Sequence, residues 1–183
     1  MCIRDRRKSV YTEDLAVKHK FPLVRLHEGG GGSVAGPSKE KKGYGGDPVF
    51  ARSRFKSVAQ TLKEVPVVSA ALGPVAGLPA SRFVGSHFRI MVKDNAQILV
   101  AGPAVVSRAF GKDFTKEELG GYDVHKKNGV TDNIAESEED AFNQIKKFLS
   151  FFPANIYELP PHKESEDAID RSEKLLEEII PKD

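Results

Sequence analysis

Residues 65–80 read VPVVSAALGPVAGLPA, and this stretch carries the clearest structural pattern in the chain. Its first half is a run of β-branched and small apolar residues between breakers, which is typical of a strand buried on both faces. Gly73-Pro74 ends the run, and residues 75–86 predict a helix that begins directly afterwards. Gly77 allows another segment or a ligand to approach the backbone closely. Because a helix start presents unpaired N–H groups, this turn could hold an anion or a developing oxyanion.

The composition is that of one globular domain. The chain has 183 residues, of which 39% are hydrophobic and 30% are charged, and its formal net charge is +2. Such a balanced charge predicts neither a nucleic-acid nor a membrane-surface partner. Cys2 is the single cysteine, so the sequence predicts neither an internal disulfide nor a cysteine metal cluster, and we expect no metal site. No apolar run is long enough to span a bilayer.

The two ends of the chain differ from its middle. Residues 1–8 begin MCIRDR and fit no element that follows, so we interpret them as adapter-derived or disordered. Residues 9–158 are expected to form the domain. Residues 159–183 begin Leu-Pro-Pro and are expected to be a linker toward a missing C-terminal domain. Within this linker, residues 168–180 predict an acidic amphipathic helix.

Helix and strand signals alternate along the domain, which predicts an α/β fold. Residues 122–128 are expected to be a loop. Thr115 and Ser137 are the predicted N-caps of the two helices that follow them. The expected helices are at 11–20, 49–64, 75–86, 115–119 and 138–151, with a short one after Gly102-Pro103, and the expected strands are at 21–26, 65–72, 88–92, 97–100 and 129–135.

Four glycines in a row follow the first expected strand. Residues 27–34 read HEGGGGSV, and residues 35–48 are rich in Gly, Lys and Pro. A flexible linker is the simplest interpretation of such a run. Because the run begins at the end of a buried strand, a loop that closely approaches a ligand is the alternative.

Four segments, in this order, resemble the N-terminal half of the carboxyltransferase (β) subunit of biotin-dependent acyl-CoA carboxylases, the family of the acetyl-, propionyl- and methylcrotonoyl-CoA enzymes. The last segment is the most specific, because it is similar to the family pattern Glu-Glu-Leu-Gly-Gly-x-x-x-His-x-x-x-Gly-Val-x-Asp. The resemblance implies a crotonase-like fold, in which β-β-α units stack into a spiral. The segments are FPLVRLHEGGGGSV at 21–34, VPVVSAALGPVAGLPA at 65–80, MVKDNAQILVAGP at 91–103 and EELGGYDVHKKNGVTD at 117–132.

The chain departs from the common family pattern at two places. Glu28-Gly29 stands where Asp-Ser is common, and Ser33 stands where Arg is common. Leu78 occupies the position of the second glycine in the Ala-Gly-Gly segment. A backbone N–H survives that change, so we expect the donor chemistry to persist while the acyl specificity differs.

The resemblance implies carboxyl transfer from carboxybiotin to the α-carbon of an acyl-CoA. In that scheme decarboxylation of carboxybiotin supplies CO₂ and a basic biotin, while the protein stabilises the thioester enolate with backbone donors, each worth about 3–4 kcal/mol. The implied oxyanion hole uses the amides of Gly77 and Leu78, with Gly30 and Gly31 as the opposite wall. Four further residues are implied to line the acyl-CoA site: Gly73, Ala76, Gly32 and Ser33.

The resemblance also implies partners. The substrate would be an acyl-CoA, and biotin would arrive on a carrier domain that a biotin carboxylase component charges. Biotin would bind at an interface with the second half of another subunit in a homo-oligomer, so we expect residues 9–183 to lack turnover alone. The implied location is the cytoplasm of a bacterium, or the mitochondrial matrix if the source is eukaryotic.

Two other functions stay open. A crotonase-fold hydratase, isomerase or hydrolase would need an acid–base carboxylate beside the oxyanion donors, and none is apparent at the expected strand and helix ends. The second is a non-catalytic subunit of a carboxylase or decarboxylase assembly.

His125 is more simply a structural hydrogen-bonding residue than an acid or base. His27 is interpreted as a packing or surface residue at a strand end, and Asp132 as a residue that fixes a turn or a helix end.

Overall fold

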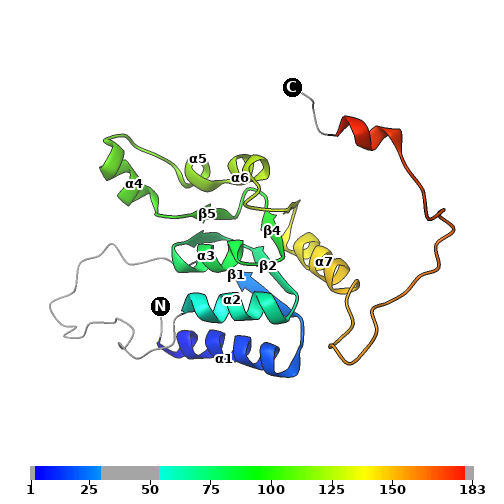
Figure 1. Ribbon diagram of the computed structural model, residues 1–183. Helices are drawn as coiled ribbons and strands as arrows, with labels where there is room; N and C mark the ends of the chain where they lie inside the picture. Colours follow the sequence, from blue (N-terminus) through cyan, green and yellow to red (C-terminus); the bar gives the residue numbers. More distant parts are fainter. Residues whose placement is uncertain (1–2, 30–53, 180–183) are drawn as a thin grey trace.

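The structure, a computed structural model, describes residues 3–29 and 54–179. Its centre is a four-stranded parallel sheet in the order β1-β2-β4-β6, beside a two-stranded parallel sheet of β3 and β5 (Figure 1). The strands are β1 (Leu23–His27), β2 (Val67–Ala71), β3 (Pro74–Ala76), β4 (Phe88–Val92), β5 (Gln97–Leu99) and β6 (Asn133–Ala135).

Helices surround these two sheets. Helix α1 packs along α2, α3 lies against β1, β2 and β3, and α7 packs on β2, β4 and β6. Figure 1 shows α4, α5 and α6 on the side of β5, away from α1 and α2. The helices are α1 (Ile3–His19), α2 (Arg54–Glu64), α3 (Leu78–Val84), α4 (Pro103–Phe110), α5 (Lys116–Gly120), α6 (Tyr122–Asn128) and α7 (Glu138–Leu149), and a 3-10 turn, η1 (Lys174–Glu178), follows.

Strand β2 is the central element, as its apolar run predicts. All five of its residues are buried, because β1 and β4 flank it and helices cover it. Val68 pairs with Val24 on one side and with Phe88 on the other. Complete burial of such a side chain stabilises the fold by about 1.5–3 kcal/mol.

The chain passes twice from the large sheet to the small sheet and then into a helix. It runs from β2 through β3 to α3, and then from β4 through β5 to α4. This repetition is the stacking of β-β-α units that the sequence predicts. Although β4 and β5 are joined by a tight turn at Asp94, they lie in different sheets and do not pair with each other.

The prediction of a helix directly after β2 is wrong. A short strand, β3, comes first, and its Val75 pairs with Ile98 of β5. The chain then turns at Gly77, whose φ of 67° favours glycine, and α3 begins at Leu78. The strand arises from pairing with a segment more than twenty residues later, which local pattern does not reveal.

Three other boundaries differ from prediction. Tyr122–Asn128 is a helix and not a loop, because the amides of Val124 and His125 donate to the Gly121 carbonyl and start a turn. The strand expected at 129–135 is confined to β6. The acidic stretch 168–180 forms only the five-residue η1, with exposed apolar side chains and no packed face to support a longer helix.

The two predicted N-caps are confirmed, whereas the N-terminal helix is longer than predicted. Thr115 and Glu118 form a reciprocal capping box at α5, and the Ser137 hydroxyl accepts a hydrogen bond from the Asp140 amide at the start of α7. Helix α1 begins at Ile3, so it includes residues that the sequence-based interpretation set apart. The origin of residues 1–8 and the linker role of 159–183 stay predictions.

Candidate functional site

The loop after β1 and the turn after β2 lie next to each other. The amide of Leu72 donates to the His27 carbonyl (2.9 Å), which continues the β1–β2 pairing past the strand ends. The Glu28 side chain lies over Gly73: a Cβ added to Gly73 would be 3.0 Å from Glu28 Cγ. These two segments therefore meet at the carboxyl edge of the large sheet, where ligands bind in parallel sheets.

The predicted donors at the corner between β3 and α3 are not equivalent. The Gly77 amide donates to the Leu99 carbonyl (3.0 Å), so this N–H is already paired within the small sheet. The prediction that the Gly77 N–H is a free oxyanion donor therefore does not fit the structure, in which this N–H holds β3 and β5 together. Leu78 is the first residue of α3, where an N–H has no intrahelical acceptor. Ala76 closes β3 opposite Leu99.

The other wall of the predicted site lies outside the described residues. Gly30, Gly31, Gly32 and Ser33 belong to the range 30–53, as does the start of the helix expected from residue 49. Gly29 is described, and a Cβ added there would meet no atom of the described residues within 4 Å. The structure thus shows where the chain leaves β1, and the glycine run stays a prediction.

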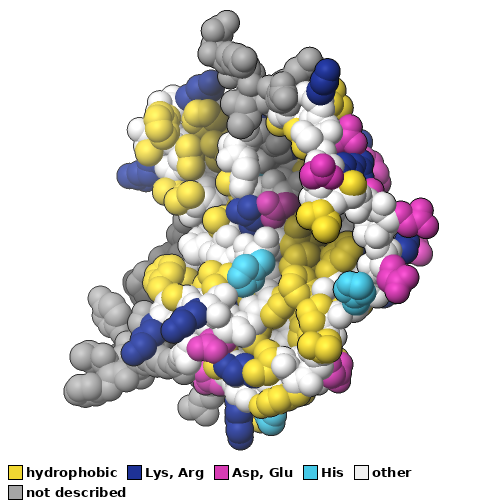
Figure 2. Space-filling view, turned by 45° about the vertical axis from the view of Figure 1, so that its right-hand side comes forward, with side chains coloured by type: hydrophobic (Ala, Val, Ile, Leu, Met, Phe, Trp, Pro, Cys, Tyr) yellow, Lys and Arg dark blue, Asp and Glu magenta, His cyan; other side chains and the backbone are white. Residues whose placement is uncertain are grey.

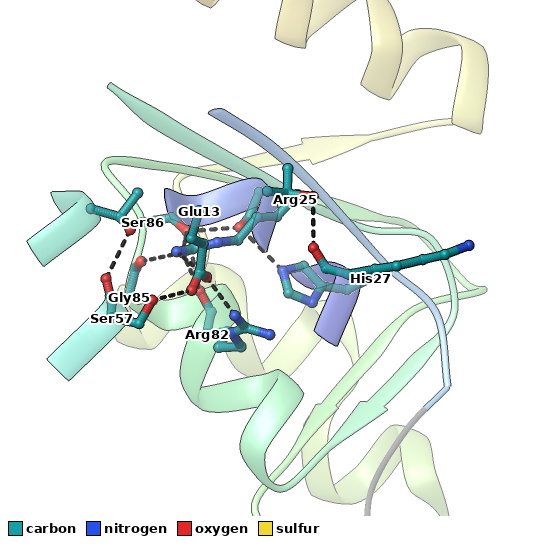
Figure 3. A network of polar contacts seen from close by, with 11 residues as sticks. Glu13, Arg25, His27, Ser57, Arg82, Gly85 and Ser86 are labelled. Carbon is teal, nitrogen blue, oxygen red and sulfur yellow. Dashed lines mark hydrogen bonds and ion pairs between the residues drawn. The ribbon is translucent and has the colours of Figure 1, made fainter. Parts of the chain in front are cut away.

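A buried network of charged side chains lies at the other end of α3 (Figure 3). Glu13 of α1 is 2% exposed and accepts from two guanidinium groups, Arg25 Nη2 at 2.9 Å and Arg82 Nη2 at 2.5 Å, both at its Oε1. The Ser57 hydroxyl of α2 donates to Glu13 Oε2 (2.7 Å). One carboxylate therefore joins α1, β1, α2 and α3.

Arg25 also binds the end of α3. Its Nη1 donates to the Gly85 carbonyl at 2.9 Å and to the Arg82 carbonyl at 3.3 Å. Burial lowers the pKa of Arg25, and the neighbouring Glu13 opposes this change. The Nε atoms of Arg25 and Arg82 are buried and have no hydrogen-bond partner in the described part of the chain. The guanidinium groups are thus held by their terminal nitrogens.

His27 lies at the inner edge of the network. Its Nε2 is 3.2 Å from Ser69 Oγ, and its ring meets Phe83 edge-on with centroids 5.9 Å apart. Burial, together with the positive charges of Arg25 and Arg82, lowers the pKa of His27 to about 4. His27 is therefore neutral at physiological pH, and its predicted packing role is confirmed.

The sequence-based reading missed Glu13 and Arg82, and only Arg25 gave a signal. Arg25 interrupts the apolar run LVRLH, and an arginine inside a buried strand requires an acceptor. Glu13 and Arg82 sit in helices with ordinary polar composition, so nothing local distinguishes them from solvated residues.

The segment with the most specific family pattern serves as scaffold. A Cβ added to Gly120 would lie 2.1 Å from the Ile98 carbonyl oxygen, so α5 contacts β5 through backbone. His125 is buried, and its Nε2 donates to the same carbonyl (2.8 Å), while Asn128 Nδ2 donates to its Nδ1 (3.2 Å). Both ring nitrogens are used within the fold, which confirms the structural interpretation of His125.

Asp132 fixes the segment before β6. It accepts from Arg89 Nη2 (2.7 Å), from Arg89 Nε (2.8 Å) and from the Arg89 amide (2.7 Å). Partial burial favours a higher pKa for Asp132, but the hydrogen bonds from Arg89 outweigh it and hold the pKa below its usual range. Asp132 thus ties the segment before β6 to strand β4, whereas the sequence predicted a residue that fixes a turn or a helix end.

An apolar groove lies at the other end of the large sheet. Figure 2 shows hydrophobic side chains around a hollow on the side of α7. A groove of about 340 Å³ there has Leu62, Pro66, Phe148 and Phe152 in its lining. Since Pro66 precedes β2, this groove is at the amino edge of the sheet, opposite the predicted site.

The described ranges, 3–29 and 54–179, contain neither a cluster of metal-ligating side chains nor a membrane-spanning helix. No group of three or more His, Cys, Asp or Glu side chains there is placed to hold a metal ion. No helix in those same ranges combines the length and apolarity needed to cross a bilayer.

A family model of the carboxyl transferase domain matches residues 4–183. The chain belongs to the carboxyl transferase family. It is 31% identical to methylmalonyl-CoA decarboxylase subunit alpha of Veillonella parvula, over 95% of this chain and 33% of that protein. It is also 31% identical to propionyl-CoA carboxylase beta chain of Roseobacter denitrificans, over 92% of this chain and 32% of that protein. This carboxyl transferase domain thus spans about a third of the length of these relatives, and the predicted resemblance is confirmed.

Solved structures of carboxyl transferases share the fold. A transcarboxylase 12S structure with bound hydrolysed methylmalonyl-coenzyme A superimposes with a TM-score of 0.66 and 23% identity, over 97% of this chain and 34% of that chain. A single-chain, multi-domain long-chain acyl-CoA carboxylase gives a TM-score of 0.68 and 27% identity, over 83% of this chain and 14% of that chain. The crotonase-like α/β fold is therefore confirmed.

Proposed function

We propose that this carboxyl transferase domain binds an acyl-CoA at the ends of β1, β2 and β3 and stabilises its enolate during carboxyl transfer. The observation that carries the proposal is the meeting of Glu28 with Gly73 at the carboxyl edge of the sheet, next along the chain to the Leu78 corner. These are the segments that resemble the acyl-CoA half of the family's site.

Leu78 supplies the central interaction in this proposal. Its N–H at the start of α3 would donate to the thioester oxygen, and the bond would strengthen as negative charge develops in the enolate. One such donor is worth about 3–4 kcal/mol in the transition state. Gly77, whose own amide is paired with Leu99, keeps the corner in its positive-φ conformation.

Biotin, when a carrier domain brings it to the site, would supply the carboxyl group and take up the α-proton. The Leu78 amide at this corner is a hydrogen-bond donor that suits the thioester oxygen of the acyl-CoA in such a reaction, and Gly77 permits the turn that exposes it. The flexible Glu28 side chain over Gly73 can move aside when the acyl end of the substrate approaches. We assign no side chain of this domain to hold the biotin.

The direction of transfer is part of the proposal. The relatives include both a propionyl-CoA carboxylase chain and a methylmalonyl-CoA decarboxylase subunit at equal identity. Both directions pass through the same enolate, so one set of donors serves either. A biotin carrier, a biotin carboxylase component, a second carboxyl transferase half and a homo-oligomer are the proposed partners, in the bacterial cytoplasm or the mitochondrial matrix.

A reconstitution experiment tests this function. The chain would be mixed with a C-terminal half from a relative, a biotin carrier already charged with a labelled carboxyl group, and propionyl-CoA, and the label transferred to the CoA ester would be measured. Product is expected only with both halves. Rapid carboxylation by the chain alone would contradict the proposed need for a second half, and no binding of any acyl-CoA would contradict the function itself.

A hydratase or isomerase is the second candidate, because the structure does place a carboxylate at a strand end. Glu28 follows β1 directly and lies over Gly73, which corrects the expectation that no such group exists. If Glu28 were an acid–base group, the chain would hydrate crotonyl-CoA without biotin, and Glu28→Gln would abolish that activity. We expect no hydration, since the family match favours carboxyl transfer.

A further inference from the structure

Helix α3 is fixed from the end opposite the proposed donor. It has seven residues, too few to hold a stable helical conformation or direction alone. The Arg82 carbonyl in its last turn and the Gly85 carbonyl at its C-cap accept hydrogen bonds from Arg25 of β1. Its Arg82 side chain binds Glu13 of α1. The helix is therefore tied both to the sheet and to the outer helix layer (Figure 3).

The network has little freedom to adopt another arrangement. Glu13 is 2% exposed and Arg25 is 8% exposed, and both oxygens of Glu13 are engaged, one by the two arginines and one by Ser57. Each partner comes from a different element of the fold. Removal of the single carboxylate would take the shared acceptor from Nη2 of Arg25 and Nη2 of Arg82, which would break the link between β1, α1 and α3.

Apolar packing could hold a helix as firmly as this network does. Hydrogen bonds between charged groups differ from apolar contacts because they also restrict the rotation of the helix about its axis and its shift along that axis. Arg82 follows Leu78 by four residues and so lies one turn away on the same side of α3. A rotation or shift of α3 at Arg82 is consequently transmitted to the Leu78 amide.

We propose that Glu13, Arg25 and Arg82 are positioning residues that aim the Leu78 N–H at the thioester oxygen of the acyl-CoA. This inference rests on the proposed function. The three residues act through the orientation of α3 and do not touch the substrate. Their loss should therefore weaken the interaction with a developing enolate more than it weakens binding of the CoA ester itself.

The test compares two ligands on the full chain by calorimetry. One is propionyl-CoA, and the other is a CoA analogue whose nitronate group mimics the planar, negatively charged enolate. The wild-type chain is expected to bind the nitronate about tenfold or more tightly than propionyl-CoA. In Glu13→Gln this preference should fall below about threefold, while the propionyl-CoA dissociation constant changes by less than about threefold.

Ile145→Ala is the matched control. Ile145 is a buried side chain of α7, which packs on β2, β4 and β6. The variant loses stability through a cavity but should keep the wild-type preference for the nitronate. Equal loss of preference in Ile145→Ala and Glu13→Gln would show a general stability effect and overturn the positioning role.

The remaining outcomes separate the inference from the function. A folded Glu13→Gln chain, judged by circular dichroism, that retains the preference would overturn the inference and leave the function standing. A wild-type chain without the preference would contradict the function, and the inference would fall with it. If Glu13→Gln does not fold, the Arg82→Lys variant tests the inference instead, because it keeps the positive charge and loses the planar guanidinium geometry. A retained preference for the nitronate in Arg82→Lys would overturn the inference, and a lost preference would support it.

Discussion

Gly120 and Gly73 are both buried glycines in family-like segments, but their surroundings differ. A Cβ at Gly120 would lie 2.1 Å from a backbone oxygen of β5, and this oxygen cannot move away because it belongs to a paired strand. A Cβ at Gly73 would lie 3.0 Å from the Glu28 side chain, which can rotate. The first glycine closes a contact within the fold, and the second keeps a strand end accessible.

The same contrast extends to the neighbouring residues. Around Gly120, the side chains of Thr115, Glu118 and His125 make hydrogen bonds within their own segment or to β5. Around Gly73, the proposed chemistry uses backbone groups. The charged side chains of Glu13, Arg25 and Arg82 are proposed to act indirectly, by holding the C-terminal end of α3. The pattern that best identifies the family is therefore a scaffold pattern, and the proposed site depends on geometry more than on side-chain identity.

The largest effect is expected at the scaffold glycine. Gly120→Ala should lower the free energy of unfolding by about 3 kcal/mol or more, because the added methyl group collides with the backbone of β5. Urea unfolding measures this loss. Gly102→Ala is the control, since a Cβ there meets no atom of the described part of the chain within 4 Å, and it should cost less than about 1 kcal/mol. Equal losses would remove the distinction between packed and open glycines.

A pH dependence is expected beside the proposed site. His27 has a folded-state pKa of about 4, below the value of 6.5 that applies when it is unfolded. The unfolded state therefore binds the proton first, and stability is lost as the pH falls from 6.5 through 4. The difference sets an upper limit of about 3 kcal/mol for the loss.

The pH profile of urea unfolding measures this effect. His27→Gln should flatten the profile between pH 6.5 and 4 relative to wild type. His162→Gln, which changes an exposed histidine, should leave the profile as it is. An unchanged slope in His27→Gln would show that the charged network beside the site does not disfavour the protonated ring.

The smallest change in stability is expected at the site glycine. Gly73→Ala should cost less than about 1 kcal/mol, since Glu28 can swing away from the new methyl group. Glu28→Ala should remove most of that cost, so the double variant should be more stable than the sum of the single effects predicts. The Gly73→Ala chain should nevertheless bind propionyl-CoA several-fold more weakly if the ligand approaches this face. Full binding would place the acyl group elsewhere.

Local patterns were sufficient for several parts of this domain. The run around β2 predicts a buried central strand, because β-branched and small residues continue through it without the alternating polar positions of a half-exposed strand. Thr115 and Ser137 predict helix starts, because a capping hydroxyl acts on amides two or three residues away. The ordered glycine segments predict the family and, with it, the fold. Each of these signals lies within a few residues of the structure that it specifies.

Long-range contacts account for what the local patterns missed. Strand β3 forms because Val75 meets Ile98, and that same pairing uses the Gly77 amide, which leaves Leu78 as the proposed donor. Glu13 becomes a buried carboxylate only because Arg25 and Arg82 reach it from other elements. The identity of such a residue sets which bonds it can make, whereas the packing of distant segments sets which of those bonds are made.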